Sequence, residues 1–306
     1  MARVLSTAFC VALLAATAGA FALTQGAKVE LVPIFRTHVD KVFSPSCKCN
    51  TRVAKIDFRL RKTERLTVWI THEGARVRTL VPGRTYRRGP VALEFDGIDD
   101  NGFTLPDGDY KPVVHLGHEH RTIELPNTMV LDTRPPAVQV RHRIYTHISP
   151  DDDHHNDDFV IHYRVSERAH GILIVDHHQV VFTLDKPLSG KLTWNGKING
   201  RLVRPGNHVL EISAQDAAGN RAKPFPFAVV TVRYIRLGRT RVLVKPGAKF
   251  ALLVLTDAPT FDWLFNHGRG TARHGTLHLR APAVPGVYRL YAQAAGHAAR
   301  ALVVVG

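Results

Sequence analysis

Residues 159–165 read Phe159-Val160-Ile161-His162-Tyr163-Arg164-Val165, with a large apolar side chain at every second position. A similar alternation, Val53-Ala54-Lys55-Ile56-Asp57-Phe58-Arg59-Leu60, lies roughly one domain length earlier in the chain. Successive side chains of a strand point to opposite faces, so this pattern predicts strands with one buried and one exposed face. Short apolar runs bounded by Gly, Pro, Asn and Asp follow each other throughout the chain beyond its N-terminal segment. The sequence therefore predicts an all-β fold.

Both alternations belong to a longer internal repeat. A Ser-Pro step precedes each of them, and a second strand-like run, an aromatic-ended strand and a Pro/Gly turn follow in the same order. The matching segments are 43–45 and 148–150, 53–60 and 159–165, 66–70 and 171–175, 93–97 and 192–196, and 105–110 and 203–208. A shorter third echo, Pro285-Gly286-Val287-Tyr288, lies near the C-terminus. Repeats at domain-length spacing predict β-sandwiches in tandem.

The repeat resembles the Ig-like domain of flagellar hook-capping (FlgD-type) proteins, a module also found in other exported bacterial proteins. The residues that carry the resemblance are the Ser-Pro steps, the hairpin Phe95-Asp96-Gly97-Ile98-Asp99-Asp100-Asn101-Gly102 and the turn Pro106-Asp107-Gly108-Asp109-Tyr110. It covers about residues 40 to 225 as two copies, and the second copy departs from the pattern at Asn195 and Asn199. The resemblance implies immunoglobulin-like β-sandwiches. The hook-assembly segment of the family has no counterpart in this chain, so no flagellar role is implied.

The domain organisation follows from the repeats and from the stiff segments between them. We expect immunoglobulin-like sandwiches at residues 38–136 and 137–232, then a smaller one at 233–306. Pro135 and Pro136 fix their own φ angles and keep the preceding residues extended, which marks the first boundary. A chain of 306 residues suits two or three domains of this size.

The N-terminal segment, residues 1–27, is a targeting signal. After Arg3 an apolar run extends to Leu23, and no further charge appears until Lys28. The segments Ala18-Gly19-Ala20 and Gln25-Gly26-Ala27 resemble signal-peptidase sites, while the length of the run also approaches that of a membrane anchor. Cleavage and anchoring both stay open. Either one predicts a hydrophobic leader helix and a protein located outside the cell or in the cell envelope.

The charge of the chain predicts polyanionic partners. The formal net charge is +15, and basic residues alternate with apolar ones, as at Arg59 and Arg61 and at Arg233 and Arg236. For an exported protein, suitable partners are an anionic cell-wall polymer, an acidic glycan or another envelope protein, and nucleic acid is not expected. Contact with the membrane is expected only through the N-terminal segment. An unspecific basic surface is the alternative.

The most acidic segment of the sequence is Asp151-Asp152-Asp153-His154-His155-Asn156-Asp157-Asp158. Carboxylate and amide oxygens at this density suit Ca²⁺, and related Ig-like modules carry a calcium-type loop at this place. The candidate ligands are Asp151, Asp153, Asn156 and Asp157. His154 stands where that pattern has Gly. A solvated turn, in which Asp and Asn side chains cap backbone N–H groups, is the competing interpretation.

In the first copy the same place holds Cys47 and Cys49, the two cysteines beyond the N-terminal segment. In an oxidising compartment two cysteines at this spacing can close a small loop on themselves. Free thiols, an intermolecular bond and a metal or redox role are the alternatives. Zinc would need two further ligands, and no second cysteine pair exists in the sequence.

The sequence contains no recognisable catalytic motif, so a non-enzymatic protein is expected. Its 18 histidines include clusters at 115–120, 154–155 and 177–178, which we interpret as surface residues. Trp69, Trp194 and Trp263 lie in strand-like runs and are expected in the cores. The sequence thus favours a structural or adhesive envelope protein that requires no cofactor. A carbohydrate-recognition or Ca²⁺-dependent binding module and an enzyme are the other function classes.

Overall fold

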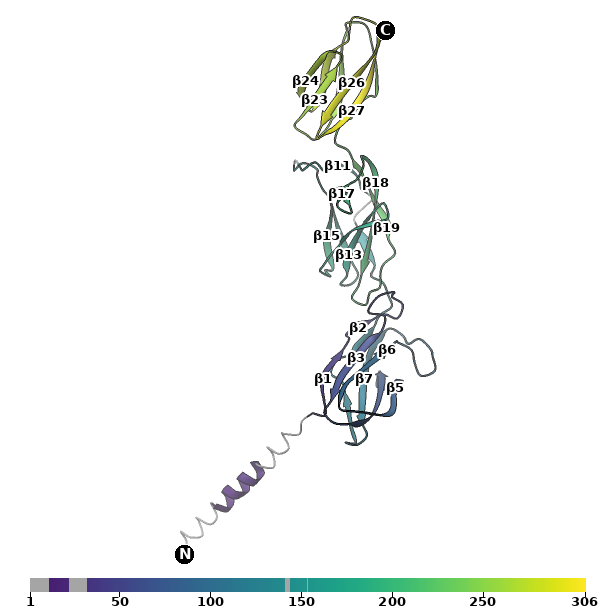
Figure 1. Ribbon diagram of the computed structural model, residues 1–306, viewed down its shortest axis with the longest axis vertical. Helices are drawn as coiled ribbons and strands as arrows, with labels where there is room; N and C mark the ends of the chain where they lie inside the picture. The colour runs from purple at the N-terminus through teal and green to yellow at the C-terminus, as the bar shows by residue number, and fades with distance from the viewer. Residues whose placement is uncertain (1–10, 22–31, 141–143, 153) are drawn as a thin grey trace. The chain divides into compact units, whose positions relative to one another are not determined.

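The computed structural model describes residues 11–21, 32–140, 144–152 and 154–306, shown in Figure 1. Residues 11–21 form a helix, in agreement with the hydrophobic leader helix expected from the sequence. Within the described residues, no helix combines the length and the apolar character needed to cross a membrane. Residues 1–10 and 22–27 of the N-terminal segment lie outside the described part of the chain.

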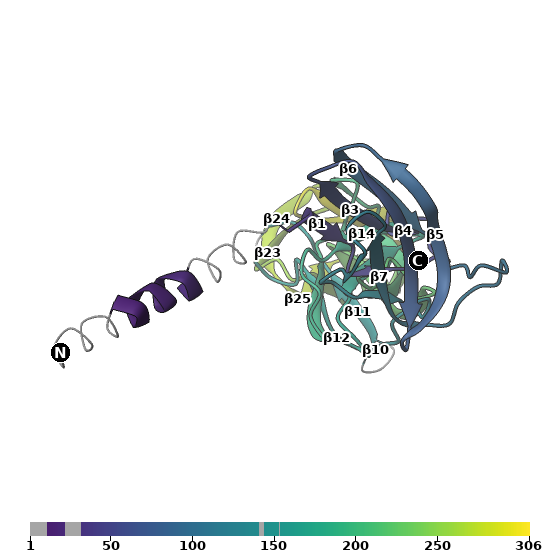
Figure 2. The same cartoon turned by 90° about the horizontal axis from the view of Figure 1, so that it is seen from below.

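The first sandwich pairs a three-stranded sheet, β1-β3-β6, with a larger sheet in the order β2-β9-β7-β4-β5, in which β8 also pairs with β7. Its strands are β1 (Ile34–Val39), β2 (Val42–Phe43), β3 (Ala54–Leu60), β4 (Glu64–His72), β5 (Ala75–Tyr86), β6 (Gly89–Phe95), β7 (Gly108–Leu116), β8 (Arg121–Glu124) and β9 (Met129–Leu131). The long strands β4 and β5 run side by side along one edge, as Figure 2 shows.

The second sandwich repeats this plan with a three-stranded sheet, β10-β12-β15, and a five-stranded sheet, β11-β19-β18-β13-β14. A two-stranded hairpin, β16-β17, turns at Asn199 and Gly200, both with positive φ, which suits an Asn-Gly turn. The strands are β10 (Val138–Val140), β11 (Ile144–Ile148), β12 (Phe159–Val165), β13 (His170–Val175), β14 (His178–Phe182), β15 (Ser189–Trp194), β16 (Lys197–Ile198), β17 (Arg201–Leu202), β18 (Gly206–Gln215) and β19 (Phe225–Val232).

The third sandwich has the same two sheets, β20-β22-β25 and β21-β27-β26-β23-β24. Its strands are β20 (Arg236–Leu237), β21 (Arg241–Val244), β22 (Lys249–Leu255), β23 (Thr260–Phe265), β24 (Gly268–Arg273), β25 (Gly275–Arg280), β26 (Gly286–Ala294) and β27 (His297–Val305). In all three sandwiches the short first strand of the larger sheet pairs in parallel with the last strand of that sheet. The other neighbouring strands of the sheet pair antiparallel. This confirms the predicted fold class of tandem immunoglobulin-like β-sandwiches.

Each sandwich has its own hydrophobic core, built from the inward positions of the alternating strands. In β12 the burial alternates without interruption, with Phe159, Ile161, Tyr163 and Val165 inside. By its contacts the chain divides into two compact units, one of Met1–Pro45 with Asn50–Asp132 and one of Ser46–Cys49 with Thr133–Gly306. The second and third sandwiches thus share one unit, whereas the domain boundaries drawn from the sequence stay a prediction.

The Pro/Gly turn that marks the repeat forms the same corner three times. The Tyr110 hydroxyl donates to the Pro106 carbonyl oxygen at 2.6 Å, and the Tyr288 hydroxyl to that of Val284 at 2.9 Å, each four residues back. In the second copy a ring nitrogen of His208 lies 2.9 Å from the Arg204 carbonyl oxygen, again four residues back. The glycines Gly108, Gly206 and Gly286 have φ angles of 157°, 151° and 157°. The sequence repeat therefore encodes one shared backbone conformation.

The three tryptophans differ in their burial. Trp194 is 1% exposed in the second core, where its indole N–H donates to the Lys197 carbonyl oxygen at 3.0 Å. Trp263 is half-buried and packs against the third core. Trp69 is half-buried under the guanidinium of Arg76, 5.2 Å from its ring centroid. The core placement expected from the sequence thus holds fully only for Trp194.

Candidate ligand-binding surfaces

The acidic loop between β11 and β12 is folded around Asp157. Its carboxylate accepts hydrogen bonds from the backbone N–H groups of Asp151 and Asp152, both at 3.0 Å, and of His154 at 2.8 Å. Asp152, His154 and Asn156 have φ angles of 64°, 68° and 53°. Such left-handed conformations suit Asp and Asn, and the Asp157 oxygens satisfy the N–H groups that this bend leaves without a strand partner.

Of the four calcium ligands predicted from the sequence, Asp153 lies outside the described residues. The described Asp, Glu, His and Cys side chains of this loop do not bring three ligand atoms within 4.8 Å of one another. The Asn156 side chain is exposed, and both Asp157 oxygens already accept backbone hydrogen bonds. This geometry favours a capping role for Asp157, and the calcium site stays a prediction.

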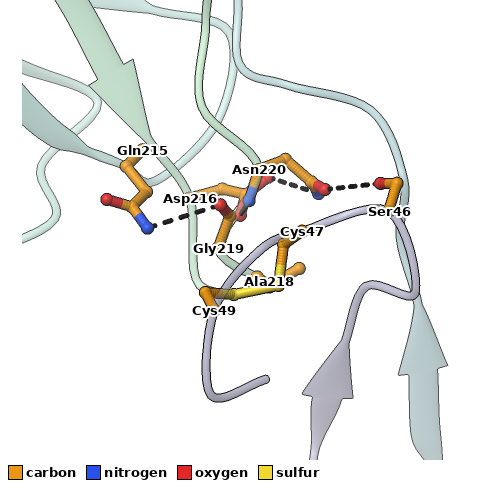
Figure 3. Close-up of a disulfide and its surroundings, with 8 residues drawn as sticks. All are labelled: Ser46, Cys47, Cys49, Gln215, Asp216, Ala218, Gly219 and Asn220. Carbon is orange, nitrogen blue, oxygen red and sulfur yellow. Dashed lines mark hydrogen bonds between the residues drawn. A yellow bond between two sulfur atoms is a disulfide. The ribbon is translucent and has the colours of Figure 1, made fainter. Parts of the chain in front are cut away.

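The corresponding loop of the first copy contains a disulfide. Cys47 and Cys49 are joined, with their Cα atoms 5.3 Å apart, and Figure 3 shows the bond beside the turn at residues 215–220. The Sγ atom of Cys49 lies 3.8 Å from the Ala218 carbonyl oxygen, and the Ser46 hydroxyl lies 3.5 Å from the Asn220 side-chain oxygen. An oxidised sulfur carries no hydrogen, so the first of these is a packing contact. The loop thus belongs by its contacts to the second compact unit.

The turn that receives this loop is held by a buried pair of polar side chains. The Asp216 carboxylate accepts hydrogen bonds from the backbone N–H and the side-chain amide of Asn220, both at 2.9 Å. Asp216 is 4% exposed and Asn220 is 5% exposed. A buried carboxylate that accepts two hydrogen bonds has a structural task, because the donors would lack partners without it.

The histidine clusters do not converge into one site. His115 is paired with Thr122 in the first sandwich, whereas His177 and His208 approach carboxylates of the second. In the second case Nδ1 of His208 lies 2.6 Å from Asp176. Burial by itself raises the pKa of Asp176, but the hydrogen bonds from His208 and the Val209 N–H and the charges of His208 and His177 outweigh it and lower that pKa.

The outer face of the five-stranded sheet of the third sandwich carries a cluster of arginines. The strand register places Arg241, Leu302 and Arg289 side by side in one row. The next row along the strands is Arg300, Tyr291, Leu264 and Arg269. Directly paired residues of neighbouring strands point to the same face. A third row contains Leu243, Val304 and Val287. We call these ten residues, together with Arg273 at the edge of the sheet, the arginine face.

The charges of the arginine face are unpaired. Arg241, Arg269, Arg273, Arg289 and Arg300 are all exposed, and none of their side chains has a hydrogen-bond or ion-pair partner within the part of the chain that the structure describes. The five strands contain one acidic residue, Asp262, whose carboxylate accepts a hydrogen bond from Thr271 at 2.7 Å. An exposed cation cluster of this kind attracts anions in solution.

The larger sheets of the other two sandwiches differ from this one. The strands β11, β13, β14, β18 and β19 contain no Lys or Arg. In the first sandwich several cations have internal partners: Arg65 and Arg78 donate to backbone carbonyl oxygens, and Lys111 pairs with Glu124 at 2.7 Å. The larger sheet of the second sandwich thus has no counterpart of the arginine face, and that of the first pairs part of its cations internally.

Sequence reasoning missed this cluster. It selected Arg59 and Arg61, but the guanidinium of Arg61 lies 4.4 Å above the Phe35 ring and donates to the Val32 carbonyl oxygen. It also selected Arg233 and Arg236, of which Arg233 is half-buried and Arg236 is exposed. Arg289, Tyr291, Arg300 and Leu302 do alternate with inward residues in the sequence, which was a usable signal. The register that brings them together was missing.

Comparison with known proteins adds no argument to the fold described above. No family model matches the sequence, and the search of curated proteins finds no significant match. Among solved structures, the fibronectin(III)-like modules of Clostridium thermocellum CbhA match at 13% identity and a TM-score of 0.35, over 64% of this chain and 94% of theirs. Titin domains I67–I69 match at 10% identity and a TM-score of 0.34, over 90% and 98%. Three domains of the bacteriophage RB49 outer capsid protein Hoc match at 11% identity and a TM-score of 0.29, over 88% and 98%. Values this low carry no argument about function.

Proposed function

We propose that this chain is an exported, non-enzymatic protein of a bacterial cell envelope, either secreted or anchored by its N-terminal segment. Its sandwiches, with the FlgD-type character of the first two, serve as binding and spacing modules. The observation that carries the proposal is the set of five exposed arginines without partners on one sheet of the third sandwich. Its partner is an anionic cell-wall polymer or glycan. The acidic surface of another envelope protein is the second partner class.

Physical chemistry supports a binding role for these charges. An exposed ion pair contributes little to stability, and an exposed arginine without any partner contributes less. Five such residues on one face repel one another, so the fold gains nothing from their clustering. A polyanion would remove this repulsion by binding, whereas a folded protein without such a partner would carry it permanently.

The experiment is retention of the purified protein on purified bacterial cell walls across a range of salt. Screening reduces the range of charge interactions from about 10 Å at 0.1 M salt to about 3 Å at 1 M salt. We therefore expect retention at low salt and release at high salt. Absence of retention at low salt, or retention that is unchanged at high salt, would contradict the proposal.

A further inference from the structure

We infer that the arginine face binds a linear acidic polysaccharide, with Arg241, Arg289 and Arg300 as anion ligands and Leu264, Tyr291 and Leu302 as contacts for the sugar rings. This inference rests on the proposed function and specifies where on the molecule, and for which class of polymer, that function acts.

The cations of the arginine face are spaced across neighbouring strands. Arg241 and Arg289 lie in the same row, two strands apart. Neighbouring strands are about 4.8 Å apart, which separates these two Cα positions by about 10 Å. Arg300 lies on the strand between them, one row further along, and Arg269 lies three strands from Arg300 in that row. Cations thus recur across the strands as separate points, which suits anionic groups that recur along an extended polymer.

Exposed apolar side chains accompany the cations on the same face. Leu243 is 74% exposed, Val287 64%, Leu264 47%, Leu302 42% and Tyr291 36%. Single exposed apolar residues are ordinary, but here they share one sheet face in adjacent rows. The C–H groups of sugar rings pack against aliphatic and aromatic side chains, while arginine forks match carboxylate or phosphate oxygens.

The order of cations and apolar side chains along the rows favours a polysaccharide over a membrane. A surface that inserts into a bilayer separates its apolar part from a charged part at the level of the headgroups. In two of the three rows of the arginine face the two kinds are interleaved: Leu302 lies between Arg241 and Arg289 in one row. In the next row Tyr291 and Leu264 lie between Arg300 and Arg269. Insertion of Leu302 would bury its charged neighbours, which is costly. A polymer that itself carries both anions and C–H surfaces fits this pattern.

The test uses polygalacturonate, a linear polysaccharide with carboxylate groups, and the purified protein. The test variant combines Arg241→Ser, Arg289→Ser and Arg300→Ser. The control variant combines Arg236→Ser, Lys249→Ser and Arg280→Ser, which removes three exposed cations from the other sheet of the same sandwich. Both variants lose the same net charge, and all six side chains are exposed, so both keep the fold. Thermal unfolding of each verifies this.

We expect the affinity of the test variant for polygalacturonate to be at least about tenfold weaker than that of the unchanged protein. The affinity of the control variant should stay within about threefold of that of the unchanged protein. The negative slope of log affinity against log salt becomes shallower by about two in the test variant, because three contacts that release counterions are removed. Equal losses in the two variants would overturn the inference and indicate unspecific basicity. If both variants bind cell walls as well as the unchanged protein does, the arginine face is not the binding site. The proposed function would then stand without this inference.

Two further measurements test the chemical class. The variant Leu264→Ser with Leu302→Ser keeps every charge, and we expect it to weaken polygalacturonate binding most clearly at high salt, where the charge contribution is screened. No change in this variant would overturn the role of the apolar rows. Binding to vesicles of anionic phospholipid, or to duplex DNA, as tight as to polygalacturonate would overturn the assignment to polysaccharide.

Discussion

The second and third sandwiches have the same sheet topology and use their charged side chains in opposite ways. In the second, Asp157 and Asp216 hold turns by accepting backbone and amide hydrogen bonds, and Asp176 pairs with His208. In the third, five arginines on the larger sheet have no partner among the described residues. The fold fixes the inner face of each sheet and leaves the outer face open, so one architecture supports a sandwich whose charges are paired internally and one that exposes unpaired cations.

This contrast predicts a double dissociation. Changes to charged residues of the second sandwich should reduce stability and leave polysaccharide binding intact. Changes to the arginine face should reduce binding and leave stability intact. Four changes outside the arginine face, at Asp216, Asp157, the Cys47–Cys49 disulfide and Asp176, are expected to affect stability alone.

The largest effect is expected at Asp216. Replacing Asp216 by Ala leaves the buried backbone N–H and amide of Asn220 without their acceptors, so we expect the free energy of unfolding to fall by about 3 kcal/mol. Urea unfolding followed by tryptophan fluorescence measures this. As a control, Asp262→Ala removes an exposed carboxylate of the third sandwich and should change stability by less than about 0.5 kcal/mol. An equal loss of unfolding free energy in Asp216→Ala and Asp262→Ala would contradict the contrast between the two sandwiches.

A smaller loss is expected at Asp157. Its replacement by Ala removes the acceptor of three backbone N–H groups in a loop that is partly open to water, which costs about 1–2 kcal/mol. The neighbouring exposed Asp158→Ala is the control and should be nearly neutral. We expect the same loss in calcium and in EDTA. A melting temperature that rises with calcium in the unchanged protein only would instead establish the predicted calcium site.

The disulfide is expected to contribute a similar or smaller amount. A bond that closes a three-residue loop removes little freedom from the unfolded chain, so the double change Cys47→Ser and Cys49→Ser should cost about 1–2 kcal/mol. Thermal unfolding with and without reductant measures this. The reductant should destabilise the unchanged protein and have no further effect on the double variant. Polysaccharide binding should persist in the unchanged protein and in the double variant, both with and without reductant. Loss of binding in any of these samples would show that stability and binding are not separate.

The smallest effect is expected from Asp176, which is partly exposed. Its pKa in the folded protein is lowered from the ordinary value of 3.8, so its stabilising contribution is present above that value and disappears as the pH falls through the lowered pKa. The unchanged protein should therefore exceed Asp176→Asn in urea midpoint at about pH 5 and lose this advantage at about pH 2. An advantage that is the same at both pH values would contradict the assigned role of the carboxylate.

The sequence predicted much of the fold and little of the candidate surface. The alternation at residues 159–165 became β12 with the same bounds, and the run at 53–60 became β3 from Ala54 to Leu60. The repeated turn forms the same corner in each sandwich, at Tyr110, His208 and Tyr288. These succeeded because strand alternation and turn conformation depend on neighbours within a few residues. The burial of Trp69 was predicted less well, because Leu66, Val68 and Ile70 take the inward positions of β4 and leave Trp69 on the other face.

What the sequence by itself determined is local: which segments form strands, which side of each strand is apolar, and where the chain turns. What only the tertiary structure decided is adjacency across strands. Arg241, Arg289 and Arg300 lie far apart in the chain, and they share one face because β21, β27 and β26 pair in one register. A shift of that register by a single residue would turn a whole strand over and disperse the cluster. Long-range pairing therefore created the surface, while local patterning created the strands that carry it.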